Sequence, residues 1–368
     1  MAKSSCTRKF VHVLSCKLAQ PVTAHAAAAS SRSLLQHRLP SSRTNSSSAP
    51  ANSPSSAPAV AAATKTFAER PSASRIMSSS SGYTVVERGA PNSTDYRLFF
   101  QNETSPISPM HDIPLFADDS KKIFHMVVEI PRWTNAKMEI NLKETLNPIK
   151  QDVKKGNLRF VANCFPHHGY IWNYGALPQT WENPEVLDEA TGFKGDNDPI
   201  DVLEIGYRVA KRGEVLKVKV LGTVALIDEG ETDWKIIVID VNDPIANQLN
   251  DIADIDKHYP GLLKATIEWF KIYKIPDGKP ENQFAFNGDA KPRDFALHVI
   301  EEVHKHWLSL VKKEATSCDI SCTNLNVTDS PFQITPSAAK EVLDKAPEPQ
   351  PARPIDPIVD KWHYVHLQ

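Results

Sequence analysis

The sequence predicts a domain that is mainly β with some α-structure, in which short strands form a barrel or a sandwich. Runs rich in β-branched and aromatic residues recur between turns of Pro, Asn and Gly, and no helical pattern separates them. Short strands without intervening helices are typical of barrels and sandwiches. Two amphipathic helical patterns come only after the last strand, so two main helices complete the domain.

The strand predictions rest on hydrophobic runs that are bounded by turn residues. They cover residues 96–100, 124–129, 137–142, 158–162, 201–205, 215–227 and 234–241. Helices are expected at 260–273 and 292–312, because apolar residues recur there at helical spacing and a proline stands near each first turn.

The first 76 residues differ in composition from the rest of the chain. They hold 16 Ser, 16 Ala and ten Lys or Arg against one acidic residue, Glu69, so this segment carries +9 and the remainder −11. Such a segment buries too little apolar surface to fold, and its composition is that of an organelle transit peptide. The alternative is a disordered tail without a targeting role. Met77 is a second candidate start.

The predicted organisation is therefore a disordered leader at 1–76, a catalytic domain at 77–313 and a C-terminal extension at 314–368. The extension is rich in Ser and Pro, and its apolar end, 359–367, is expected to dock on the domain. No run of 18 apolar residues occurs, so no membrane association is predicted.

Three carboxylates lie within six positions in Gly195-Asp196-Asn197-Asp198-Pro199-Ile200-Asp201. Mg²⁺ prefers such oxygen ligands and completes its coordination with waters and substrate phosphates. An EF-hand is excluded, because Asp201 and Tyr207 occupy the places of its Gly and its last Glu. A solvated acidic turn remains the alternative when this motif is taken alone.

A second acidic turn, residues 228–235, joins two strongly apolar strands. Strand alternation places Asp233 and Lys235 on one face and Trp234 on the other, so a metal ligand and an anion contact share a surface. Asp228 opens the same turn. The alternative is an ordinary hairpin tip.

Cationic and phenolic residues recur beside the apolar strands. Lys137 and Glu139 lie two apart on one strand face, and Glu129 belongs to the strand before, so an internal ion pair is the simpler interpretation. The functional interpretation is a site that holds both signs of charge, as a metal complexed to a polyanion requires. The other members of this set are Arg159, Tyr170, Tyr174, Tyr273 and Lys274.

Four segments together resemble the family I soluble inorganic pyrophosphatases, in their eukaryotic, animal-like branch. They are Val128-Glu129-Ile130-Pro131-Arg132-Trp133, residues 196–201, residues 228–235 and residues 272–279, and the ending Val359-Asp360-Lys361-Trp362-His363 is similar as well. The resemblance implies an OB-like five-stranded β-barrel flanked by two main helices. It also implies a homodimer that binds several Mg²⁺ ions and pyrophosphate at the barrel mouth.

The resemblance also implies roles for individual residues. Asp196, Asp201 and Asp233 match the main metal ligands. Asp228 matches the ligand of a further metal, and Glu139 supports the ligands of that metal. Asp198 matches the general base that deprotonates the attacking water, and Glu129 and Tyr174 complete the catalytic set. The expected pyrophosphate contacts are Lys137, Arg159, Tyr170, Tyr174, Lys235, Tyr273 and Lys274.

The expected activity is Mg²⁺-dependent hydrolysis of pyrophosphate to two orthophosphates by a metal-activated water, without a covalent phosphoenzyme. A rival hypothesis is an interaction protein, because some animal relatives are similar to subunits of chromatin-remodelling assemblies. Direct nucleic-acid binding is not expected, since the body carries −11 and lacks a basic stripe. A product that starts at Met77 is expected to be cytoplasmic, and the full-length chain mitochondrial.

Overall fold

Five strands close into a barrel in the computed structural model, which describes residues 77–78, 82–316 and 319–366. The predicted leader lies outside these residues. The ring order is β6, β12, β14, β16, β15 and back to β6, and only the pair β14 and β16 is parallel. The bounds of these strands are Ile123–Ile130, Asn173–Ala176, Asp201–Glu204, Glu231–Asp240 and Val215–Asp228.

Short strands extend the barrel at its edges. They are β5 (Phe116–Asp118), β13 (Lys194–Gly195), β17 (Gln283–Phe284) and β18 (Lys291–Pro292). A second sheet contains β1 (Met77–Ser78), β2 (Thr84–Arg88), β3 (Arg97–Gln101), β4 (Pro106–Ile107), β7 (Met138–Ile140) and β8 (Ile149–Gln151). Two small pairs join β9 (Val153–Lys154) to β10 (Asn157–Leu158) and β11 (Asn163–Cys164) to β19 (Trp362–His363).

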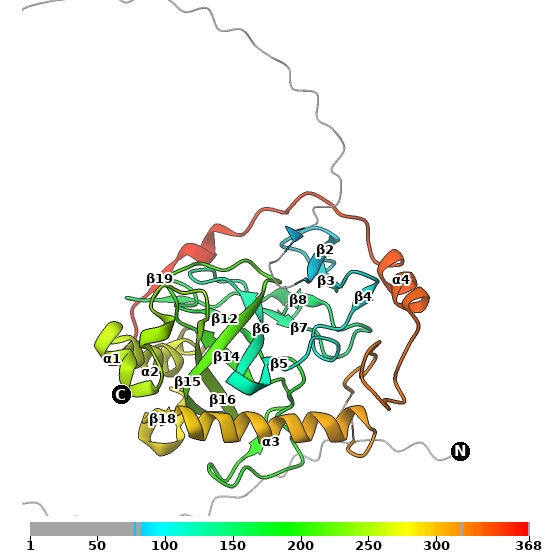
Figure 1. Cartoon of the computed structure of the whole chain (residues 1–368). Helices are drawn as coiled ribbons and strands as arrows, with labels where there is room; N and C mark the ends of the chain where they lie inside the picture. The colour runs from blue at the N-terminus through cyan, green and yellow to red at the C-terminus, as the bar shows by residue number, and fades with distance from the viewer. Residues whose placement is uncertain (1–76, 79–81, 317–318, 367–368) are drawn as a thin grey trace, which may run out of the picture. The chain divides into compact units, whose positions relative to one another are not determined.

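Four α-helices occur in the described part of the chain (Figure 1). They are α1 (Ile252–His258), α2 (Leu262–Ile272), α3 (Arg293–Val311) and α4 (Pro336–Asp344). Single 3₁₀ turns are η1 (Asp119–Lys121), η2 (Ala246–Gln248), η3 (Ile275–Asp277), η4 (Ala285–Gly288) and η5 (Pro357–Asp360). The two longest helices, α2 and α3, are those that the sequence predicts.

Alternation along the barrel strands divides the core into two clusters, one with α2 and the C-terminal part of α3, the other with the N-terminal part of α3. On β16, Trp234 and Ile236 pack with Ile300 and other residues of α3. Ile237 and Ile239, one position out of phase, pack in the cluster that includes α2. Because successive side chains point to opposite faces, the polar residues in phase with Ile237 lie on the α2 side.

One prediction from periodicity was wrong, and one helix was not predicted. The strand expected at 158–162 is reduced to β10, because the chain bonds to two separate segments: Arg159 N donates to the Asp152 carbonyl, and Val161 N to that of Asn135. Helix α4, in the Ser- and Pro-rich extension, was not predicted from the sequence. The Thr335 hydroxyl caps it by accepting from Ala338 N, and the buried Leu343 anchors it.

The C-terminal extension contacts the domain well before its end. The Asp112 carboxylate accepts the backbone N–H groups of Leu325 and Asn326 at 2.7 and 2.8 Å. The predicted docking segment includes β19, which pairs in parallel with β11. Among the described residues, no helix is both long and apolar enough to cross a membrane.

Candidate active site

Strand β16 carries the centre of the site. Asp233 and Lys235 lie on its α2 side, and the Lys235 Nζ is 2.5 Å from Asp233 Oδ1. Trp234 points to the opposite face, where it packs against Phe295. The alternation predicted from the sequence is therefore confirmed.

The acidic turn that follows β13 is shaped by Asn197. Its φ of +76° lies in the left-handed region, which Asn tolerates better than most residues. Its Oδ1 accepts a hydrogen bond from Trp181 Nε1 at 3.0 Å, and its N–H donates to the Glu182 carbonyl at 2.9 Å. The turn is closed by Asp198 N, which donates to Asp196 Oδ1 at 3.0 Å. These bonds hold the two aspartates against the 181–182 segment.

A carboxylate cluster results at this junction. One carboxylate oxygen from each of Glu182, Asp196 and Asp233 lies within 4.8 Å of the others. Glu182 Oε1 accepts from Trp234 N at 3.0 Å, and its buried Oε2 has no hydrogen-bond partner among the described residues. Sequence reasoning missed Glu182, because it stands in Trp-Glu-Asn-Pro, well before either acidic turn and without any ligand-like spacing.

Lys235 joins this cluster to Asp201 on the neighbouring strand. Its ammonium group contacts Asp201 Oδ2 and lies 3.1 Å from the Tyr174 hydroxyl, which itself donates to Asp201. Burial alone would lower the pKa of Lys235, but Asp201 and Asp233 outweigh that effect and raise it well above its ordinary value. Lys235 is therefore a permanent cation between two carboxylates.

The remaining predicted cations also pair with carboxylates. Lys274 Nζ contacts both oxygens of Asp228, and Lys137 Nζ lies 2.5 Å from Glu139 Oε2. The ion pair proposed as the simpler interpretation for Lys137 is thus present.

Arg159 has a carboxylate partner that sequence reasoning missed. Its Nη1 lies 3.0 Å from Asp152 Oδ2, and the same oxygen is 3.8 Å from Lys137 Nζ. Asp152 stands directly after β8, and no motif in the sequence marks it.

The phenols and Glu129 line the space between these groups. The rings of Tyr170 and Tyr174 lie 5.1 Å apart, and Tyr273 stacks on Trp269 at 4.7 Å. Glu129 Oε1 accepts from Ile140 N at 2.6 Å. Burial, and then Asp201, raises the pKa of Glu129 well above its ordinary value.

The acidic residues of the two turns lie close enough to repel one another. Asp198 is exposed, but partial loss of solvent among the crowded groups, and then the charge of Glu139, raises the pKa of its carboxyl above the usual range. The pKa of Asp196 is raised well above its usual range by burial and by Asp233. Each shift means that an additional positive charge would stabilise the ionised carboxylates.

A divalent cation satisfies this requirement. The donor set consists of carboxylate oxygens, which suit Mg²⁺, Mn²⁺ or Ca²⁺ rather than a soft metal. A bound cation would also stabilise Oε2 of Glu182, because a buried carboxylate oxygen without a hydrogen-bond donor is costly. The residues present therefore fit a site for hard cations.

Comparison with known proteins decides the family. The family model described as inorganic pyrophosphatase matches residues 126–308. An inorganic pyrophosphatase from Drosophila melanogaster is 65% identical over 287 residues, which cover 78% of this chain and 85% of the relative. The chain belongs to the inorganic pyrophosphatase family.

Solved pyrophosphatases have the same fold. The structure of inorganic pyrophosphatase from Schistosoma japonicum is 50% identical, with a TM-score of 0.74, and the match covers 76% of this chain and all of that one. An N-terminally truncated vacuolar soluble pyrophosphatase from Trypanosoma cruzi, in complex with PPi, matches with 42% identity and a TM-score of 0.58, covering 67% of this chain and 98% of that one. The predicted OB-like barrel is confirmed, and this chain is an inorganic pyrophosphatase.

Every residue that the sequence predicted for the site lies inside the matched region of this pyrophosphatase. Most of them interact directly. Asp198 belongs to the same neighbourhood, since the charges of Glu139, Lys137, Asp201 and Asp233 all act on its pKa. The structure therefore brings the two acidic turns and the cationic set to one end of the barrel.

Proposed function

We propose that the reaction is Mg²⁺-dependent hydrolysis of pyrophosphate to two orthophosphates, with water as the nucleophile and Asp198 as its general base. The observation that carries this proposal is geometric: oxygens of Glu182, Asp196 and Asp233 lie within 4.8 Å of one another, and Asp198, whose N–H donates to Asp196 Oδ1 at 3.0 Å, stands beside them as a carboxylate that can accept a proton from water. The Trypanosoma cruzi relative in complex with PPi supports pyrophosphate as the substrate.

The metal would be held by Asp196, Asp201 and Asp233, with a further ion at Asp228 and support from Glu139. Bound Mg²⁺ supplies Lewis-acid chemistry, which lowers the pKa of water and neutralises phosphate charge. Glu182 belongs with the metal-binding carboxylates, because its oxygen lies within 4.8 Å of those of Asp196 and Asp233.

The chain's own cations bind the phosphates. Arg159 presents a planar guanidinium that suits two phosphate oxygens. Lys137 lies close to it, because both cations contact the same oxygen of Asp152. The ammonium groups of Lys235 and Lys274 exchange a carboxylate for a phosphate oxygen as the substrate binds. The hydroxyls of Tyr170, Tyr174 and Tyr273 stay protonated, since burial raises the pKa of each, and they donate to the anion.

Phosphate release tests this proposal. The purified full-length chain should hydrolyse pyrophosphate with Mg²⁺, and Asp198→Asn should lower kcat by about 10²- to 10⁴-fold, as expected for a lost general base. Asp256→Asn is the matched control, because Asp256 is an exposed residue of α1. A wild-type chain that is inactive with bound metal, or an active Asp198→Asn variant, would contradict the proposal.

We also propose that the enzyme is a homodimer. Three exposed aromatic residues of this chain support it: Phe165 packs on Trp362 with ring centroids 6.0 Å apart and on Tyr364 at 5.5 Å. Adjacent exposed aromatic side chains favour association. Sedimentation velocity should give a dimer for the wild type and a monomer for Trp362→Ala/Tyr364→Ser; a wild-type monomer would contradict the proposal.

Two start sites would give two locations. A product that begins at Met77 is proposed to be cytoplasmic, and a full-length product mitochondrial, because the basic, acid-poor composition of residues 1–76 suits an organelle transit segment. Sequencing the N-terminus of the mature protein tests this.

Association with chromatin-remodelling subunits stays a prediction, which co-purification of the Asp198→Asn variant with such subunits would test.

A further inference from the structure

The segment between α4 and η5 has a conformation that its prolines restrict. We call residues 347–357 the proline strap. Proline fixes φ near −65° and also pushes the preceding residue toward extended backbone, so only Ala352 and Ile355 of the strap escape both restraints. Asp356, at the end of the strap, has φ −61° and ψ 126°, close to the values of polyproline II. Its prolines are Pro347, Pro349, Pro351, Pro354 and Pro357.

Spacing along the strap places apolar groups in rows. Polyproline II has three residues per turn, so residues three apart lie on one edge. Pro351, Pro354 and Pro357 have this spacing and form one ridge, and Ala352 and Ile355 form the ridge beside it. All five side chains are exposed, and Ile355 keeps 48% of its surface accessible. Two adjacent apolar ridges therefore face outward.

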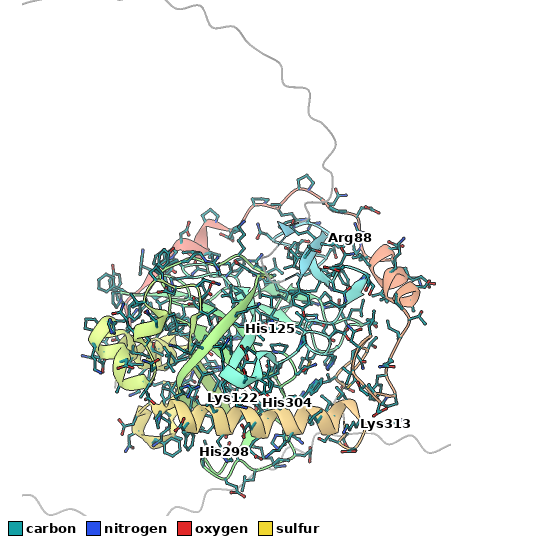
Figure 2. The ribbon with its side chains drawn as sticks, in the orientation of Figure 1. Arg88, Lys122, His125, His298, His304 and Lys313 are labelled. Atoms are coloured by element: carbon teal, nitrogen blue, oxygen red, sulfur yellow. The ribbon has the colours of Figure 1, made fainter. Side chains whose placement is uncertain are left out.

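Backbone groups on the third edge of the strap, at Pro347, Gln350 and Arg353, bond to the domain. Figure 1 shows the segment after α4 passing β2 and β3. At the start of the strap, Glu348 Oε2 lies 3.8 Å from Nη1 of Arg88, which Figure 2 labels. Glu348 is three residues before Pro351 and in line with it, so the proline ridge faces outward from Pro351 onward. Hydrogen bonds join the strap to residues 89–92 on that side. They run from Gly89 N to the Pro347 carbonyl, from Gln350 N to the Gly89 carbonyl, from Arg353 N to the Pro91 carbonyl and from Asn92 Nδ2 to the Arg353 carbonyl, at 2.8 to 3.2 Å.

We propose that the proline strap is a recognition site for a protein domain that binds polyproline II segments in a groove lined with aromatic side chains. Such grooves take two adjacent ridges of a polyproline II helix. The N–H groups of Gln350 and Arg353 are already used by the domain, and the prolines have none. Of the five residues on the outward ridges only Ala352 and Ile355 carry an N–H group, so these ridges offer mainly apolar side chains and carbonyls. That surface suits aromatic rings with side-chain donors such as Trp Nε1.

Tethering favours this interaction. A free peptide must be ordered when it binds, whereas the strap is held in its extended form by four hydrogen bonds. A strand-type partner is disfavoured, because a strand that adds to a sheet needs regular N–H donors, and five of the eleven residues of the strap are prolines. The side chains of the two ridges are uncharged, so they do not favour a partner that binds mainly through charge.

Binding to purified domains tests the proposal. The probes are a panel of ¹⁵N-labelled SH3, WW and EVH1 domains, each titrated with the unlabelled full-length chain. At least one domain should show saturable chemical-shift changes confined to its aromatic groove. Pro354→Ala should weaken that binding by about tenfold, the loss expected when a central contact of an interface is truncated.

Pro347→Ala is the matched control, because Pro347 lies off both outward ridges and should leave binding unchanged. Phosphate release by each variant verifies folding, since the strap contributes no residue to the active site. The proposal is overturned if no domain of the panel binds, or if Pro347→Ala weakens binding as much as Pro354→Ala does. It is also overturned if Pro354→Ala changes the sedimentation of the chain alone, because the ridges would then serve a second copy.

Discussion

Trp181 Nε1 donates a hydrogen bond to Asn197 Oδ1 at 3.0 Å. Trp181 is fully buried, and its neighbour Glu182 belongs to the carboxylate cluster. Asn197 stands between Asp196 and Asp198 with a left-handed backbone. One hydrogen bond thus connects a buried anchor to the turn that carries the proposed general base.

The first prediction separates the two contributions of Asn197. Asn197→Gly keeps the left-handed backbone but removes the amide, so it should raise the Mg²⁺ concentration needed for half-maximal activity with little loss of stability. Asn197→Ala should add a cost of about 1–2 kcal/mol, because a Cβ is unfavourable in that region. Mg²⁺ titrations of phosphate release and urea unfolding measure the two effects. Wild-type Mg²⁺ dependence in Asn197→Gly would contradict this role.

The second prediction concerns the buried charge of Lys235. The side chain is 2% exposed and stands between Asp201 and Asp233, so Lys235→Met leaves two buried carboxylates without their cation. In a chelator, the variant should lose about 3–5 kcal/mol of unfolding free energy. Added Mg²⁺ should restore part of this loss, because a ligand that binds only the native state stabilises it.

The double variant Asp233→Asn/Lys235→Met is its control. Since it removes a carboxylate together with the cation, it should be more stable in chelator than Lys235→Met alone. Equal unfolding free energies for the two variants would show that Asp233 carries no net charge when Lys235 is absent.

The third prediction tests the close approach at Gly195. A Cβ at this position would lie 2.4 Å from the Glu182 carbonyl carbon and 2.5 Å from its oxygen. Gly195→Ala should therefore cost roughly 1–3 kcal/mol and move Glu182 away from Asp196, which weakens Mg²⁺ binding. Urea unfolding and isothermal titration with Mg²⁺ measure both. Lys194→Ala, at the exposed neighbouring residue, should change neither; an unaltered Gly195→Ala would disprove the steric argument.

The fourth prediction is a pH effect at His111. Its Nδ1 accepts from Trp307 Nε1 at 2.9 Å, so its Nε2–H donates to the Ser321 carbonyl at 3.0 Å and joins α3 to the C-terminal extension. Burial lowers the pKa of His111 from 6.5 to about 4. Between these values the unfolded chain binds the proton more readily, so stability falls as the pH falls below 6.5.

Between pH 7 and pH 5 the expected loss from this histidine is about 2 kcal/mol. His111→Gln carries no titrating group, so its unfolding free energy should fall by that much less over the same range. The comparison isolates His111 because the carboxylates titrate in both proteins. Parallel pH profiles for the two proteins would be the contrary result.

Local sequence determined most of the strands, the two main helices and the two acidic turns. Period-two alternation predicted that Asp233 and Lys235 share a face, and the Asp-rich spacing predicted hard-cation ligands. These features depend on neighbours within a few residues, so the sequence shows them directly. The same local signals failed at 158–162. There the backbone bonds to two separate segments, at Asp152 and at Asn135, and not to one continuous neighbouring strand.

Tertiary structure decided what spacing could not show. Glu182 joins the site because its Oε1 accepts from Trp234 N on β16 at 3.0 Å. Asp152 joins it because its N–H donates to the Lys137 carbonyl and its own carbonyl accepts from Arg159 N, both at 2.8 Å. Partial desolvation, and then charges contributed by β7, β14 and β16, raise the pKa of the exposed Asp198. The sequence by itself determined which residue types were available, and the packing of distant segments decided which of them lie close enough to act on one another.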